Sequence, residues 1–159
     1  MPDRLAGAWA AVSPVLFPVQ AGLFLFLLLL VSVWDLRFRE IPDRLQLAIA
    51  VLTFLCFSPG NLLGVFGAAP YLLAALSFHG MDGMGGGDIK LAAATGAVLG
   101  LPMSLLASMI GLGAFTVYST VYTAAARLRG RKGRIAFPVG PFLALGAVIA
   151  YIIKNGGIV

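Results

Sequence analysis

The chain has 159 residues, of which 60% are hydrophobic and only 11% are charged, and its formal net charge is +5. About a quarter of the residues in a soluble domain are charged, so this composition excludes an ordinary soluble domain and indicates a protein that faces lipid. Cys56 and His79 are each the only residue of their type, which excludes a disulfide framework and predicts no metal site and no cofactor. In a membrane protein, a positive balance favours contact with anionic lipid over nucleic-acid binding.

The apolar residues form six runs, at roughly 15–34, 42–59, 61–79, 88–102, 103–126 and 135–153. The first run has enough residues for about 30 Å of helix, which spans a membrane and is too long for a signal-peptide core. Short segments with proline and glycine separate the later runs and favour tight turns. The sequence therefore predicts an all-α, polytopic bundle of about six transmembrane helices. Residues 1–159 form a single membrane domain, with 1–14 as a short non-cytoplasmic segment.

Charge predicts how this bundle is oriented. The connection at 35–44 carries three basic residues, the connection at 127–134 carries five, and Lys90 lies beside the glycine run. The alternate connections, near 58–62 and 100–104, carry no charge. By the positive-inside rule, the charged connections lie in the cytoplasm and both termini lie outside.

Two acidic residues occur at the ends of apolar runs. Asp35 closes the first run, Asp88 opens the fourth, and both fall on the predicted cytoplasmic side. Ionisable groups at such a depth usually face a bundle interior or a wet cavity, so they are functional candidates. Two carboxylates that meet there would repel and share one proton, and such a pair suits peptide hydrolysis by general acid and base.

The glycine run before Asp88 has two interpretations. Without side chains at Gly85, Gly86 and Gly87, an extended substrate backbone could come close to the acid, and the start of the helix could adopt strained angles. Alternatively, Asp88 is an ordinary capping acid at a helix start.

The other acids have structural interpretations. Asp43 follows Pro42 as an acid in the first turn of a helix, Glu40 balances its arginine neighbours, and Asp82 is solvated in the glycine loop. Asp35, taken alone, could also pair with nearby arginines at the membrane boundary.

Three segments in chain order, "DLRFREIPDRL", "GMGGGDIKL" and "FPVGPFLALGA", resemble the type IV prepilin peptidases, bacterial membrane aspartic proteases with a G-x-G-D motif. The resemblance implies that Asp35 and Asp88 are the catalytic pair. It makes Gly85 and Gly87 the motif glycines. We also expect Gly86 and Lys90, in the same stretch, to lie where the substrate approaches. The segment with Pro138, Gly140 and Pro141 corresponds to a late P-x-G-P element, which together with Pro42 would support the site structurally.

The resemblance further implies an endopeptidase that removes the basic leader of a prepilin or pseudopilin. Cleavage would occur at the cytoplasmic face of the inner membrane, just before the hydrophobic helix of the substrate. Larger members carry an extra region with paired cysteines and also N-methylate the trimmed pilin. This sequence lacks that region and resembles the short form associated with Flp-type, tight-adherence pili.

Two other functions use the same residues. Asp35 and Asp88 could form a proton relay in a small transporter, or they could be structural in a non-catalytic subunit of a pilus or secretion machine. A transporter would often show repeat-like halves with helices broken at mid-membrane. Here both acids lie at the ends of the runs on one side, which favours the peptidase.

Overall fold

The computed structural model describes residues 2–77, 85–129 and 137–156, with side chains described from Val15 onward. Within these ranges the regular elements are helices, as the composition and run lengths predict. In chain order they are α1 (Pro2–Phe38), α2 (Asp43–Val51), η1 (Leu52–Phe54), α3 (Pro59–Leu62), η2 (Leu63–Ala68), α4 (Ala69–Ser77), α5 (Gly86–Leu99), α6 (Leu101–Leu128) and α7 (Gly140–Asn155).

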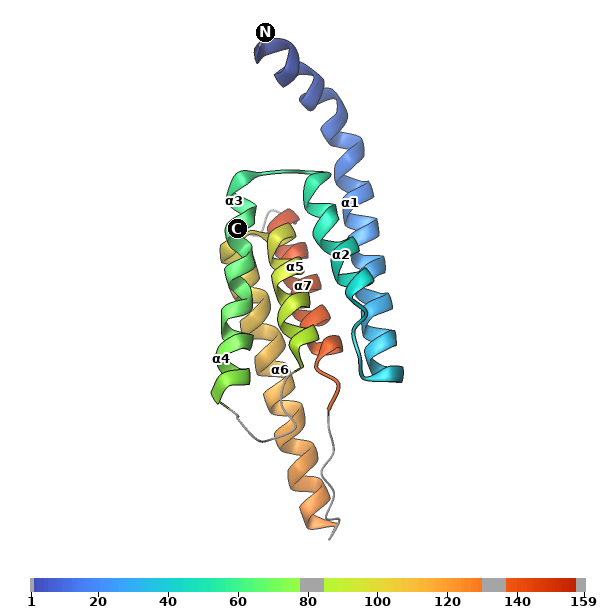
Figure 1. Ribbon diagram of the computed structural model, residues 1–159, viewed down its shortest axis with the longest axis vertical. Coiled ribbons are helices and arrows are strands. Elements are labelled where there is room, and N and C mark those ends of the chain that lie inside the picture. Colours follow the sequence, from blue (N-terminus) through green and yellow to red (C-terminus); the bar gives the residue numbers. More distant parts are fainter. Residues whose placement is uncertain (1, 78–84, 130–136, 157–159) are drawn as a thin grey trace.

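These elements run up and down a single bundle (Figure 1). The segments Val15–Phe38, Pro59–Leu76 and Leu101–Leu128 are long and apolar enough to cross a membrane, and Gly140–Asn155 is a shorter apolar helix. In Figure 1, α1 begins and α7 ends at the upper end of the bundle, whereas α1 ends and α5 begins at the lower end. The expectation of a multi-pass helical membrane bundle is confirmed. α1 is longer than the predicted run, because its helix already begins at Pro2.

α5 is the central helix of the bundle. It packs against α2, η2, α6 and α7, while α7 in turn packs against α1 and α6. The buried apolar core draws on every one of these helices; its largest fully buried side chains are Tyr71, Phe24, Leu28, Ile49, Leu91, Leu99 and Val31. Many large apolar side chains point outward instead, among them Leu29, Phe66, Met109 and Val117. An apolar exterior of this extent is a surface for lipid.

Glycines allow two of the closest helix contacts. A side chain at Gly64 or at Gly96 would overlap the backbone of the other residue, so η2 and α5 approach each other through paired glycines. Small residues at such contacts are typical of membrane helices. Gly100 turns the chain directly from α5 into α6 with a φ of +81°, a left-handed conformation that glycine adopts without strain. α5 is thereby fixed firmly among its neighbours.

Candidate active site

Asp35 lies in the last turn of α1 and is only 5% exposed. Its Oδ2 accepts a hydrogen bond of 2.9 Å from the backbone N–H of Gly140, the first residue of α7. The first N–H groups of a helix have no partner within it and carry a partial positive charge, which favours an anion at this place. The N-terminus of α7 therefore positions and stabilises the Asp35 carboxylate.

The P-x-G-P element makes this contact possible. Pro141 occupies the first turn of α7, where a missing N–H costs nothing, and Pro138 lies just before the helix begins. A Cβ at position 140 would lie 2.8 Å from Oδ2 and 3.0 Å from Cβ of Asp35. Only a glycine leaves room for the acid, so this element touches the site directly.

Asp88 lies in the first turn of α5 and is 8% exposed. Its Oδ2 accepts a hydrogen bond of 3.2 Å from the N–H of Gly85, and its own N–H donates to the Gly85 carbonyl over 3.0 Å. Gly85 is the N-cap of α5, and the negative charge of Asp88 in the first turn interacts favourably with the helix dipole. Asp88 thus caps the start of α5 from the third helical position, whereas the capping interpretation made it the N-cap residue itself. This cap leaves a chemical role open.

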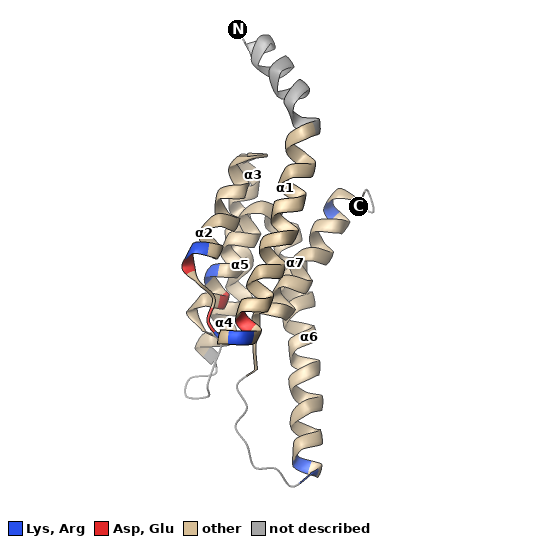
Figure 2. Cartoon of the chain, turned by 90° about the vertical axis from the view of Figure 1, so that its right-hand side faces the viewer, with Lys and Arg blue, Asp and Glu red and all other residues tan. Residues whose placement is uncertain are grey.

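Asp35 lies on α1 and Asp88 lies on α5, and other helices of the bundle pack against both α1 and α5. α2 and α7 each pack against both α1 and α5. In the described residues, each carboxylate accepts its hydrogen bond from a backbone N–H rather than from the other acid. Figure 2 shows charged residues gathered at the end of α1, the start of α2 and the start of α5. The fold therefore places the two acids that the sequence singled out at the same end of the bundle.

The glycines before Asp88 are not required by packing. A Cβ at Gly86 would meet nothing within 4 Å, and one at Gly87 would make ordinary contacts of 3.5 Å with Gln46 and Ile41. The predicted strain is wrong, since Gly85 is extended with a φ of −68° and Gly86 and Gly87 lie inside the helix without a positive φ. Of these three glycines, Gly86 faces open space at the start of α5.

Gln46 is a site residue that the sequence did not indicate. It is 5% exposed, and its Nε2 donates to the carbonyls of Ile41 and Gly87 over 3.2 and 3.3 Å. Gln46 thus ties the start of α5 to the α1–α2 connection. The Pro42 carbonyl in that connection accepts from Leu45 and starts α2, which fits the structural role expected of Pro42.

Lys90 forms an ion pair of 2.9 Å with Asp43, the first residue of α2. The two side chains are 62% and 75% exposed, so this pair lies at the surface between α2 and α5. The expected first-turn position of Asp43 is correct. Asp82, which was expected to be solvated, and the single histidine, His79, lie outside the described residues. Within the described ranges no three His, Cys, Asp or Glu side chains gather as metal ligands.

The fold and the site define a class: multi-pass membrane proteins with a buried pair of carboxylates at one end of a helical bundle. The model of the type IV leader peptidase family matches residues 22–123, a stretch that contains both acids and the glycine run. The chain belongs to the type IV leader peptidase family.

Several similar proteins carry the name prepilin leader peptidase/N-methyltransferase. The one from Bacillus subtilis (strain 168) is 37% identical over 156 residues, which cover 92% of this chain and 60% of that protein. The one from Escherichia coli (strain K12) is 34% identical, covering 91% of this chain and 67% of that protein. The one from Xanthomonas campestris pv. campestris is 32% identical, covering 76% and 45%. The chain thus corresponds to only part of these relatives' length. No solved structure matches it.

Proposed function

We propose that this chain is an aspartic endopeptidase that removes the leader peptide of prepilin-like proteins at the membrane. The observation that carries the proposal is the pair Asp35 and Asp88. Both carboxylates are buried, both lie at the same end of the bundle, and each accepts a hydrogen bond from a backbone N–H at the start of a helix. Membership of the type IV leader peptidase family supports the same reaction.

The chemistry requires the pair to hold one proton between them. The ionised carboxylate takes a proton from a water molecule, which attacks the scissile carbonyl, while the protonated carboxylic acid donates to the carbonyl oxygen. The proton taken from water then passes to the leaving amine. Open space at Gly86 leaves room for an extended substrate backbone at the start of α5, in the same turn as Asp88.

We further propose that the acidic end of the bundle faces the cytoplasm from the inner membrane. Figure 2 shows lysines and arginines at the end of α1, near the starts of α2 and α5, and at the end of α6. In the sequence, these segments carry Arg37, Arg39, Arg44, Lys90, Arg127 and Arg129. Connections rich in lysine and arginine stay in the cytoplasm. In this orientation, the basic leader of the substrate would meet the same end of the bundle. An Flp-type prepilin or a pseudopilin is the first substrate to test.

Incubation of the purified protein with an Flp-type prepilin in detergent tests the proposal. The wild type is expected to shorten the prepilin on a gel, and an Asp88→Asn variant with the same thermal unfolding is expected to leave it intact. A transporter that uses the acids as a proton relay would not cleave prepilin in either form. Equal cleavage by both proteins would exclude the proposed mechanism.

A further inference from the structure

An aromatic cluster joins the second half of α6 to the start of α7. It consists of Phe115, Tyr118 and Tyr122 on one face of α6, together with Phe137 and Phe142. The ring centroid of Phe142 lies 5.8 Å from that of Phe115 and 5.2 Å from that of Tyr118. The ring centroid of Phe137 lies 5.8 Å from that of Tyr118 and 5.2 Å from that of Tyr122. Aromatic rings at such distances attract each other, so the cluster fixes both phenylalanines on α6.

These two phenylalanines flank the P-x-G-P element. Phe137 comes directly before its first proline, and Phe142 comes directly after its second. The N–H of Gly140, inside the element, donates the hydrogen bond of 2.9 Å to Asp35. Each proline fixes one backbone dihedral angle, so few free torsions separate this N–H from the anchored phenylalanines. A Cβ at Gly111 of α6 would lie 3.0 Å from the Phe142 carbonyl oxygen, so the backbones of α6 and α7 are also close. The direction of the Gly140 N–H is therefore set from α6.

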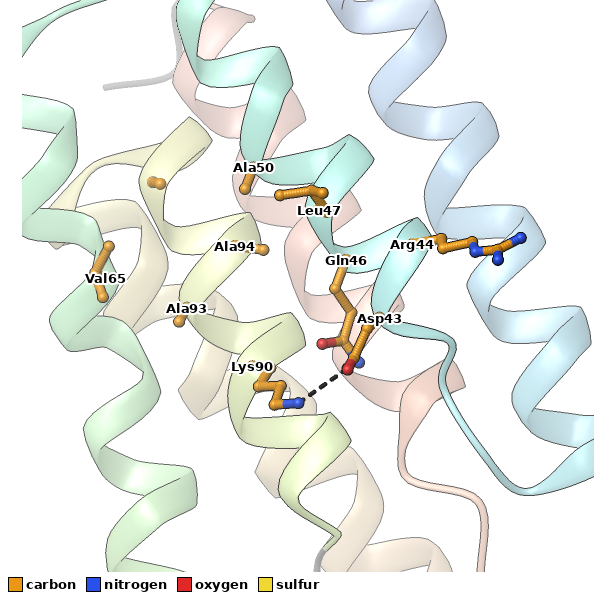
Figure 3. A pocket seen from close by; sticks show the side chains of 10 residues that line it. Asp43, Arg44, Gln46, Leu47, Ala50, Val65, Lys90, Ala93 and Ala94 are labelled. Carbon is orange, nitrogen blue, oxygen red and sulfur yellow. Dashed lines mark hydrogen bonds and ion pairs between the residues drawn. The ribbon is translucent and has the colours of Figure 1, made fainter.

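The start of α5, which carries Asp88, is held by different contacts. Gln46 of α2 donates to the carbonyl of Gly87 over 3.3 Å. Lys90 pairs with Asp43, the first residue of α2, over 2.9 Å. Figure 3 shows these side chains between α2 and α5, beside a largely apolar groove of about 570 Å³. The five residues of the aromatic cluster belong to neither α2 nor α5, so loosening the cluster should disturb Asp35 and leave Asp88 in place.

We propose that the aromatic cluster holds the Gly140 N–H against Asp35, and that Tyr118, which contacts both phenylalanines, is the central positioning residue of the candidate active site. This inference rests on the proposed peptidase function and gives α6 a part in the site. A catalytic group has to be held within about 0.5 Å of its working position. Tyr118 meets this requirement for Asp35 through Gly140 rather than by contact with the substrate.

The kinetics of leader removal test the inference with two substitutions at one position. Tyr118 is 45% exposed; Tyr118→Leu removes the ring but keeps an apolar side chain, whereas Tyr118→Phe keeps the ring. A displacement of about 1 Å at a reacting group can cost about 100-fold in rate. For a smaller displacement of Asp35, we expect Tyr118→Leu to lower kcat about tenfold at unchanged KM.

Two controls accompany Tyr118→Leu. Tyr118→Phe should keep the wild-type kcat, because the ring contacts remain. Phe54→Leu breaks the exposed ring pair of Phe54 and Phe57 at the other end of the bundle, and it should also keep the wild-type kcat. Wild-type kcat in Tyr118→Leu, or an equal loss in Tyr118→Phe or Phe54→Leu, would overturn the inference.

A double-mutant cycle distinguishes positioning from a general loss of stability. If Tyr118 acts through Gly140, adding Tyr118→Leu to Gly140→Ala should lower kcat by no more than about twofold beyond Gly140→Ala alone, since residues that act as a unit are not additive. A further loss of about tenfold in the double variant, as expected for independent effects, would overturn the inference.

Hydrogen exchange measured by mass spectrometry gives a readout that does not depend on cleavage. Tyr118→Leu is expected to speed amide exchange about tenfold in peptides from the start of α7 and to leave peptides from the start of α5 unchanged. Unchanged exchange at α7, or equal acceleration at both helices, overturns the positioning role whatever the wild type cleaves. If exchange at α7 responds but the wild type cleaves no prepilin, the proposed function is wrong, and the part of the cluster in catalysis falls with it.

Discussion

Asp35 accepts its hydrogen bond from a residue 105 positions later in the chain, whereas Asp88 accepts its bond from a residue three positions earlier. The first contact exists only when α7 packs against α1, and the second forms within the first turn of α5. The position of Asp35 thus depends on the assembled bundle, while that of Asp88 depends on a local cap. Substitutions that loosen α7 should move one acid and spare the other.

The largest effect is expected from the acids themselves. Asp35→Asn and Asp88→Asn should each reduce prepilin cleavage by about 10³-fold or more, because asparagine keeps the shape but cannot carry the proton. The double variant should lose about as much as either single variant, since paired catalytic groups act as a unit. Rates of leader removal are compared with those of Glu40→Gln, an exposed acid in the α1–α2 connection. Additive losses in the double variant would contradict a shared proton.

The next largest effect is expected from Gly140→Ala, which should disturb Asp35 but not Asp88. The added methyl group would lie 2.8 Å from Asp35 Oδ2, so the acid or the start of α7 has to shift. A displacement of about 1 Å at a reacting group can cost about 100-fold in rate, and we expect a loss of that order in kcat. The cap of α5 should remain intact, so we expect the affinity for uncleaved prepilin to stay unchanged. Wild-type kcat in Gly140→Ala would show that Asp35 does not need its α7 partner.

Gly86→Ala is the counterpart on the side of Asp88. Nothing in the described structure lies within 4 Å of the new methyl group, and alanine loses less backbone entropy than glycine when the helix forms. The variant should therefore unfold at an equal or higher temperature. If the space belongs to the substrate, KM should nonetheless rise about tenfold, as expected for one extra methyl group in a filled pocket. Unchanged kinetics would mean that substrate does not occupy this space.

The smallest effect is expected from the pair of Lys90 and Asp43. Both side chains are mostly exposed, and exposed ion pairs contribute about 0–1 kcal/mol to stability. A double-mutant cycle with Lys90→Met and Asp43→Asn, followed by thermal unfolding, measures the coupling free energy. A coupling well above 1 kcal/mol would make this pair a structural clasp between α2 and α5.

The contrast between the local contact of Asp88 and the long-range contact of Asp35 also explains what the sequence could predict. The helix starting near Asp88 follows from a glycine run, an acid and an apolar segment within a few residues, all of them local signals. The apolar runs also indicated the helical bundle, and their charged ends indicated which acids share one end. Contact between Gly140 and Asp35 has no local signal, and only the family resemblance placed the P-x-G-P element near the site. Gln46 was missed because a single glutamine in an apolar helix resembles any other polar surface residue.

α5 and α6 differ greatly in length, with 14 and 28 residues. At 1.5 Å per residue, α5 is about 21 Å long, whereas the hydrocarbon layer is about 30 Å thick. This hydrophobic mismatch has to be met by a thinner bilayer beside α5 or by water that enters from the side where α5 begins. Asp88 lies at the start of α5, so the proposed peptidase would draw its hydrolytic water from this side of the membrane.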